Sequence, residues 1–129
     1  METKINRLGL LHDTCLKKVE TSENGFHFVF SFYLEDGKEY HVELITNNIA
    51  NVSCAEHYRD SRTVAKELVD LHEVDCIKVE KKGDSFEILL ENIEKDTIIE
   101  LHFSSTEHQL IGDTKELEEF WDIDQTIEE

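Results

Sequence analysis

Residues 26–34 read Phe26-His27-Phe28-Val29-Phe30-Ser31-Phe32-Tyr33-Leu34. Bulky apolar side chains occupy every second position, a period of two that is typical of a β-strand with one face in the core. The alternate positions are mixed rather than charged, which favours a central strand over an edge strand. We therefore expect an antiparallel sheet in which Phe30 is buried.

The turn that follows this strand sets its pairing with the next one. Asp36-Gly37 is a strong hairpin signal. A two-residue loop would not place the apolar residues of the two strands opposite one another. The three-residue loop Glu35-Asp36-Gly37 instead places Phe30 opposite Val42. We expect the three-residue loop, with Gly37 in the left-handed conformation.

The turn that precedes the strand is less regular. Asn24-Gly25 predicts a two-residue turn that places Val19 opposite Phe30. The same register leaves Lys17 facing the aromatic strand, so we expect a bulge near Lys17.

A helix is expected in the middle of the chain. Asp60 or Ser61 can cap it, and Val64, Leu68 and Leu71 recur at helical spacing up to its end at about Leu71. Thr114 can cap a short C-terminal helix, which Trp121 would dock on the sheet. The remaining strands are expected at residues 49–57, 75–82, 86–91 and 97–104.

These elements predict one α+β domain over residues 1–129, with residues 124–129 frayed. It is an antiparallel meander of about six or seven strands with one main helix and a short C-terminal helix. The chain contains no proline and no Gly/Ser-rich segment that would mark a linker.

The composition favours an acidic, cytoplasmic protein. Thirty acidic residues against thirteen basic ones give a formal net charge of −17, which repels a nucleic-acid backbone and suits a basic protein partner. No apolar run is long enough to span a membrane, so we expect neither a nucleic acid nor a membrane as partner. Three cysteines suit free thiols in a reducing compartment. The oligomeric state stays open.

One constellation has the residue types of a zinc site. Cys54-x2-His57 and His72-x3-Cys76 could converge on a tetrahedral ion, because zinc favours thiolate and imidazole ligands at short spacings. In the alternative, both cysteines pack inside strands and both histidines lie at element ends. We expect no resident cofactor and keep zinc as the alternative.

Two further clusters could carry acid or base chemistry. His12 and Asp13 precede the first strand near Cys15, although adjacent residues on a strand point to opposite faces. Glu56 and Asp60 flank a junction between elements, where they can equally form ion pairs or a helix cap. The sequence has no phosphate-binding glycine loop and no Gly-x-Ser-x-Gly, His-Glu-x-x-His or Cys-x-x-Cys motif.

The C-terminal segment, residues 113–129, suggests a protein-binding surface. Its carboxylates alternate with apolar and aromatic residues, so that aromatic anchors would be buried while carboxylates steer a basic partner. A solvated helix face is the alternative. The residues proposed for binding are Glu116, Glu119, Phe120, Trp121 and Asp122.

The opening Leu11-His12-Asp13-Thr14-Cys15-Leu16, followed by a charged strand, a turn and an aromatic strand, resembles small bacterial proteins of unknown function. Some of these families resemble immunity proteins of polymorphic-toxin systems. The resemblance covers the first half of the chain and implies a cytosolic inhibitor that binds a cognate toxin.

The sequence therefore predicts a non-enzymatic protein-binding module, of which an immunity-type inhibitor of a basic toxin is one form. Two alternatives remain. One is a metal-binding or hydrolytic domain that uses the Cys/His cluster, and the other is an accessory structural domain that oligomerises through an uncovered sheet face.

Overall fold

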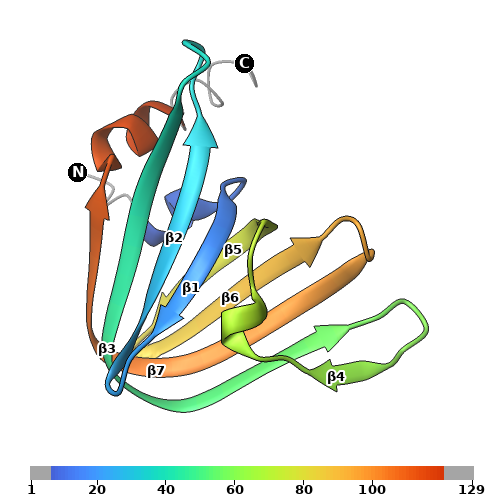
Figure 1. Ribbon diagram of the computed structural model, residues 1–129. Helices are drawn as coiled ribbons and strands as arrows, with labels where there is room; N and C mark the ends of the chain where they lie inside the picture. The colour runs from blue at the N-terminus through green and yellow to red at the C-terminus, as the bar shows by residue number, and fades with distance from the viewer. Residues whose placement is uncertain (1–6, 121–129) are drawn as a thin grey trace.

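The computed structural model describes residues 7–120, and most of them lie in one antiparallel sheet (Figure 1). Two short 3-10 helices, η1 (Arg7–Leu11) and η2 (Leu68–Asp70), accompany it, and residues 114–120 are helical. The strands are β1 (Cys15–Thr21), β2 (Gly25–Tyr33), β3 (Glu39–His57), β4 (Thr63–Ala65), β5 (Val74–Lys82), β6 (Ser85–Asn92) and β7 (Thr97–Gly112). The prediction of a mostly antiparallel sheet is confirmed.

The sheet closes on itself. Its strand order is β2-β1-β5-β6-β7-β3-β4, and β2 also pairs with β3. Six strands therefore form a closed ring, and the three-residue β4 is added to the far end of β3.

Strands β3 and β7 belong to both halves of this ring. Their first and last parts pair with different neighbours, and both strands curve strongly between the two (Figure 1). The pairing of β3 with β7 shifts register between Ala50 and Ser53, next to Asn51, which has a φ of 55°. A bulge bends its strand, and asparagine tolerates this left-handed conformation. Strand β3 therefore continues through Asn51, and the separate strand expected at residues 49–57 is its second half.

Aromatic side chains fill the interior. Phe28 and Phe30 on β2 are fully buried, as the alternation predicts. Phe103 on β7 stacks on Phe86 with ring centroids 5.0 Å apart, and it lies 5.9 Å from Phe28. Aromatic pairs of this geometry add to the burial of their area, so Phe103 joins the two halves of the core.

The register of β2 and β3 agrees with the prediction. Phe30 pairs with Val42, Gly37 has a φ of 76°, and its N–H donates to the carbonyl of Leu34. The three-residue loop therefore preserves the apolar face of both strands.

The register of β1 and β2 differs from the prediction by two residues. Val19 pairs with Phe28 rather than Phe30, because four residues instead of two separate the last residues that pair, Thr21 and Phe26. A shift of two keeps the same side chains on the same face, so alternation alone does not distinguish the two registers. The bulge is present at Lys17, as predicted.

The expected main helix from Asp60 or Ser61 to Leu71 is wrong. The chain instead turns back at residues 58–62, with Ser61 at a φ of 72°, and forms β4. Val64 pairs with Glu56, and it is exposed rather than buried. Pairing with the free edge of β3 thus outweighs a weak helical pattern that contains β-branched residues.

The C-terminal helical residues pack on the rim of the sheet. Leu117 is buried, its N–H donates to the carbonyl of Asp113, and the Phe120 ring lies 5.4 Å from that of Phe32. Asp113, rather than Thr114, therefore occupies the cap position. Trp121 and residues 124–129 lie outside the described residues. In the part of the chain that the structure describes, no helix has the length and apolarity needed to cross a membrane.

Candidate functional site

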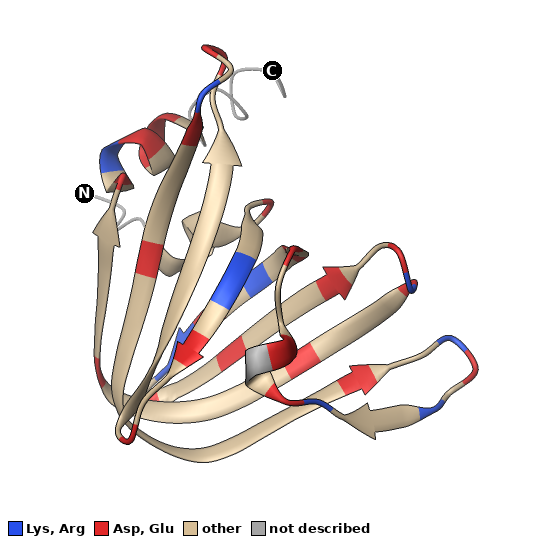
Figure 2. Cartoon of the chain, viewed as in Figure 1, with Lys and Arg blue, Asp and Glu red and all other residues tan. Residues whose placement is uncertain are grey.

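Carboxylates dominate the surface because acidic residues outnumber basic ones (Figure 2). Most of the described basic side chains are also paired with an acidic one. The paired cations are Lys17, Lys18, Arg59, Arg62, Lys66, Lys78 and Lys82. Apart from the mostly buried pair of Lys66 with Glu56, these pairs are largely exposed and contribute little stability. Each pair uses one carboxylate for one cation, so the larger number of acidic residues leaves unpaired carboxylates in excess.

The β2–β3 turn and the C-terminal helical residues form one acidic end of the molecule (Figure 2). Residues 33–40 and 113–120 together carry seven carboxylates against Lys38 and Lys115. We call this surface the acidic end, and its carboxylates include Glu35, Asp36, Asp113, Glu116 and Glu119.

Hydrogen bonds show how the acidic end is held together. The Tyr40 hydroxyl donates to Asp36 at 2.5 Å, and the His41 N–H donates to Asp113 at 2.9 Å. The bond to Asp36, with desolvation and the negative charges of Asp36, Glu116 and Glu119, raises the pKa of Tyr40 to about 12. The turn and the helical residues therefore act on one another electrostatically.

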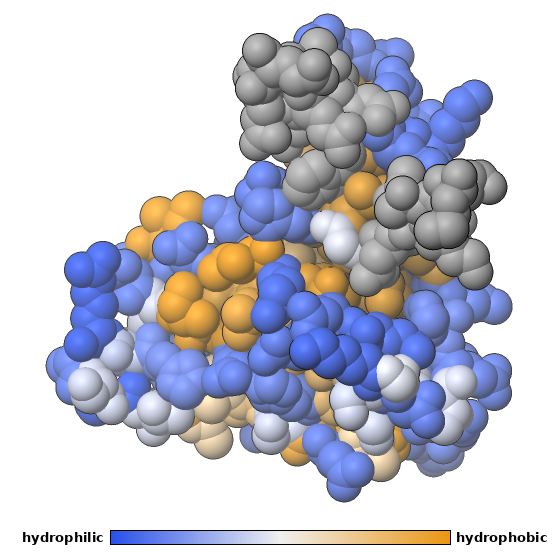
Figure 3. Space-filling model, turned by 180° about the vertical axis from the view of Figure 1, so that it is seen from behind, coloured by the Kyte–Doolittle hydropathy of each residue, from blue (hydrophilic) through white to orange (hydrophobic). Residues whose placement is uncertain are grey.

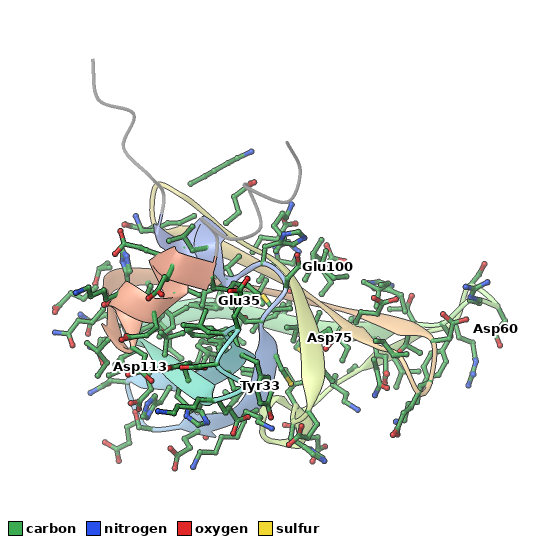
Figure 4. The ribbon with its side chains drawn as sticks, turned by 90° about the horizontal axis from the view of Figure 1, so that it is seen from above. Tyr33, Glu35, Asp60, Asp75, Glu100 and Asp113 are labelled. Atoms are coloured by element: carbon green, nitrogen blue, oxygen red, sulfur yellow. The ribbon has the colours of Figure 1, made fainter. Side chains whose placement is uncertain are left out.

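Tyr33, at the end of β2, is an exposed aromatic residue beside this carboxylate group. Its relative exposure is 60%, and Figure 4 shows it near the loop that carries Glu35. Tyr33 was not singled out from the sequence, because it follows the alternation as an ordinary outward-facing strand position. Its place next to an acidic turn is the signal that could have identified it.

The proposed C-terminal binding residues divide into three groups. Glu116 is half-buried and Glu119 is exposed, and both lie on the acidic end. Phe120 packs against Phe32, which makes it an internal contact more than an anchor for a partner. Trp121 and Asp122 lie outside the described residues.

The four residues of the expected zinc site lie apart. Cys76 is buried on β5 and Cys54 is half-buried on β3, with β6 and β7 between them. Burial raises the pKa of the Cys54 thiol to about 11 and that of Cys76 to about 12. Both sulfurs are thus protonated and packed like small apolar groups.

The two histidines of that set point elsewhere. His57 faces away from the core, with its Nε2 atom 3.0 Å from Glu100 and its Nδ1 atom 3.1 Å from Thr63. His72 is exposed before β5, with its Nδ1 atom 3.2 Å from the carbonyl of Asp70. The structure brings His57 to Glu100 rather than to the cysteines.

His12 and Asp13 do meet, although they are adjacent. Asp13 has a φ of 71°, and its carboxylate lies 3.5 Å from His12 Nε2. Cys15, however, is directed to Glu73, with its sulfur 4.0 Å from that carboxylate. Burial and the negative charge of Glu73 raise the pKa of the Cys15 thiol, which works against a nucleophilic role.

Glu56 and Asp60 occupy different environments. Asp60 lies at the tip of the projecting β3–β4 hairpin and pairs with Arg62 at 3.0 Å (Figure 4). Glu56 is buried, and its two oxygens accept hydrogen bonds from Thr97 and Tyr58. The two carboxyls therefore form no common acid/base pair.

A pocket of about 590 Å³ is lined in part by Lys66, whose ammonium group lies 3.5 Å from the buried Glu56. The other charged lining includes Lys95 as well as Asp70, Glu73 and Glu94. This mixture of charges selects no particular ligand.

Hydrophobic side chains reach the surface near the middle of one face, surrounded by hydrophilic ones (Figure 3). The large hydrophobic residues that are most exposed belong to several different elements, and they are Tyr33, Val52, Val64, Ile93, Ile98 and Ile111. Oligomerisation through a sheet face stays a prediction that no contact tests.

Comparison with family models, with curated proteins and with solved structures gives no match for this chain.

Proposed function

We propose that this chain is a non-enzymatic protein-binding module whose acidic end recognises a basic surface on a partner protein. The observation that carries the proposal is the grouping of Glu35, Asp36, Glu116 and Glu119 around one end of the molecule, beside the exposed ring of Tyr33. Among the exposed large hydrophobic residues of the described chain, Tyr33 is the only aromatic one.

The two kinds of side chain contribute to binding in different ways. A cluster of negatively charged carboxylates accelerates the encounter with a basic partner and disfavours binding of acidic proteins. An aromatic ring supplies the buried anchor, because tyrosine is among the residues that dominate binding energy at interfaces. We expect Tyr33 to be this anchor and Glu116 and Glu119 to contribute through charge.

The scaffold favours such a role because it holds the acidic end in place. The turn that carries Asp36 joins two strands of the closed ring, and the helical residues are pinned by Leu117 and Phe120. A surface held this way loses little conformational entropy on binding.

A more specific form of this function is the inhibition of a basic toxin. The resemblance of residues 11–16 and of the following strands to immunity proteins suggests it, and the acidic end has the charge such an inhibitor needs. The inhibitor would act by covering a basic surface of the toxin.

The experiment is an affinity purification at low ionic strength from the organism that encodes the chain, followed by mass spectrometry. We expect a basic protein to be captured and to elute as salt is raised. The variant Glu116→Lys/Glu119→Lys should bind it about tenfold more weakly or worse, because charge reversal opposes the partner. If the captured protein has a toxic activity, adding the purified chain should reduce it.

The control is a variant with the same change in net charge elsewhere. In Glu23→Lys/Asp84→Lys, one substitution lies in the β1–β2 turn and the other in the β5–β6 turn. This variant should bind the captured protein as the unmodified chain does. Equal capture by the acidic-end variant, or recovery of no basic protein, would contradict the proposal.

A further inference from the structure

A second cluster of side chains lies on the outer face of the sheet, away from the acidic end. Glu87 on β6 is directly opposite His102 on β7, and Glu100 precedes His102 by two residues on the same face. Regular strand pairing therefore fixes the positions of all three residues. We call them the donor cluster.

The donor cluster directs three ligand atoms to one point. His102 Nε2 lies 2.8 Å from Glu100 Oε2 and 3.7 Å from Glu87 Oε2. One ligand atom from each residue lies within 4.8 Å of the other two, which occurs nowhere else among the described histidine, cysteine, aspartate and glutamate side chains. Each side chain is about a third to two-fifths exposed, which leaves room for a further ligand from solvent.

The second oxygen of each carboxylate contacts a basic side chain outside the donor cluster. His57 Nε2 lies 3.0 Å from Glu100 Oε1, and Lys78 Nζ lies 2.8 Å from Glu87 Oε1. Thr63 Oγ1 contacts the other ring nitrogen of His57, so a neutral imidazole can donate to Glu100 and accept from Thr63. Contacts of this kind orient the ligands of metal sites and increase their affinity.

We propose that Glu87, Glu100 and His102 bind one divalent transition-metal ion such as Zn²⁺, with His57 as the residue that positions Glu100. Zinc accepts carboxylate oxygen and imidazole nitrogen at about 2.0 to 2.2 Å, so two ligands of a tetrahedral ion are roughly 3.4 Å apart. The distances of 2.8 and 3.7 Å to His102 Nε2 lie on either side of this value. Water would complete the coordination.

A surface network of ion pairs is the competing interpretation, and the geometry distinguishes the two. The free oxygens of Glu100 and Glu87 are both directed to the same imidazole nitrogen, at 2.8 and 3.7 Å. One divalent cation at that point would contact all three donors and neutralise both carboxylates.

His27 offers an internal comparison. It also contacts two carboxylates, but through different nitrogens, since Nε2 faces Glu43 and Nδ1 faces Glu20 at 3.5 Å. Its side chain is 34% exposed, similar to the donor cluster. It therefore has the same chemistry without the convergence on one point.

The test is a titration of the metal-free full chain with Co²⁺ and Zn²⁺. We expect one ion per chain by calorimetry, and for Co²⁺ a visible absorption of nitrogen and oxygen ligands without the charge-transfer band of a thiolate. His102→Gln and Glu100→Gln should abolish this binding. His57→Gln should weaken it about 10- to 100-fold, as expected for an outer residue that orients a ligand, and His27→Gln should leave it unchanged.

The outcomes that would overturn the proposal are equally clear. They are the absence of stoichiometric binding, binding that survives His102→Gln, an equal loss in His27→Gln, or a thiolate band that assigns the metal to a cysteine. Circular dichroism of each variant checks that the fold is retained. The result does not depend on the protein-binding proposal, because the acidic end is unchanged in all four variants.

Discussion

Glu56 shows how a single residue departs from its ordinary behaviour. Its relative exposure is 2%, yet it accepts hydrogen bonds from Thr97 at 2.5 Å and Tyr58 at 3.3 Å, and Lys66 lies 3.5 Å away. Burial alone would raise the pKa of this carboxyl. The Thr97 hydroxyl and the nearby ammonium groups outweigh it and lower the pKa.

Replacement of Glu56 tests this balance. Glu56→Ala leaves a buried hydroxyl and a mostly buried ammonium group without their partner, so it should lower the free energy of unfolding by about 3 kcal/mol. Glu56→Gln keeps an acceptor for Thr97 and should cost clearly less. Chemical denaturation at pH 7 measures both, and equal losses in the two variants would contradict the role of the hydrogen bond.

The same residue contributes to the dependence of stability on pH. A carboxyl whose pKa is lowered by folding stabilises the protein above its unfolded pKa, and this contribution is lost as the pH falls through the folded value. The unmodified chain should therefore lose more stability below about pH 4.5 than Glu56→Gln does.

At the scale of elements, a local sequence pattern predicted the structure correctly where no other register or strand pairing was compatible with the same segment. The register of β2 with β3 was predictable because alternation and Gly37 indicate the same loop. The β1–β2 loop was not, because two registers bury the same side chains. The expected helix at residues 60–71 failed because the free edge of β3 offered that segment a strand partner.

The candidate sites follow the same logic. Glu116 and Glu119 could be grouped from the sequence because they are close together in it, and their role in binding stays a prediction. The donor cluster was missed, although Glu100-x-His102 has the spacing of one strand face, because Glu87 joins it only through the pairing of β6 with β7. Cys54 and Cys76 looked like ligands in sequence but face the core.

The pairing of β2 with β3 requires a glycine at its far end. A Cβ atom at Gly25 would lie 2.0 Å from the backbone oxygen of Thr46, whereas one at Gly9 would meet nothing within 4 Å. Gly25→Ala should therefore lower the free energy of unfolding by about 2 kcal/mol, and Gly9→Ala should change it by less than about 0.5 kcal/mol. Urea denaturation of the two variants compares them directly, and similar values would mean that β3 moves away from the new methyl group without cost.

At the scale of the whole molecule, net charge opposes the compact state. Thirty acidic residues against thirteen basic ones repel one another on the folded surface, and salt screens this repulsion. The stability of the fold should therefore respond to ionic strength as a property of the entire surface rather than of any one pair.

The midpoint of thermal unfolding at pH 7 should rise as NaCl increases from about 0.01 to about 0.15 M, because the screening length falls from about 30 to about 8 Å. The same titration near the isoelectric point of about 4.6 is the control, since the net charge is then close to zero. A midpoint that falls with salt at pH 7 would show that the local ion pairs matter more than the overall repulsion.

The closed ring also affects how the protein folds during its synthesis. The β2–β3, β5–β6 and β6–β7 hairpins each pair strands that are adjacent in the sequence. Closure of the ring, however, requires β3 to pair with the distant β7, and this pairing runs from the Val42–Gly112 pair to the His57–Ile98 pair. On a ribosome, the aromatic face of β2 therefore emerges long before Phe103, the residue that covers it from the other half. Such a nascent chain exposes apolar surface and unpaired strand edges during synthesis, and its dependence on chaperones should end only when β7 has left the exit tunnel.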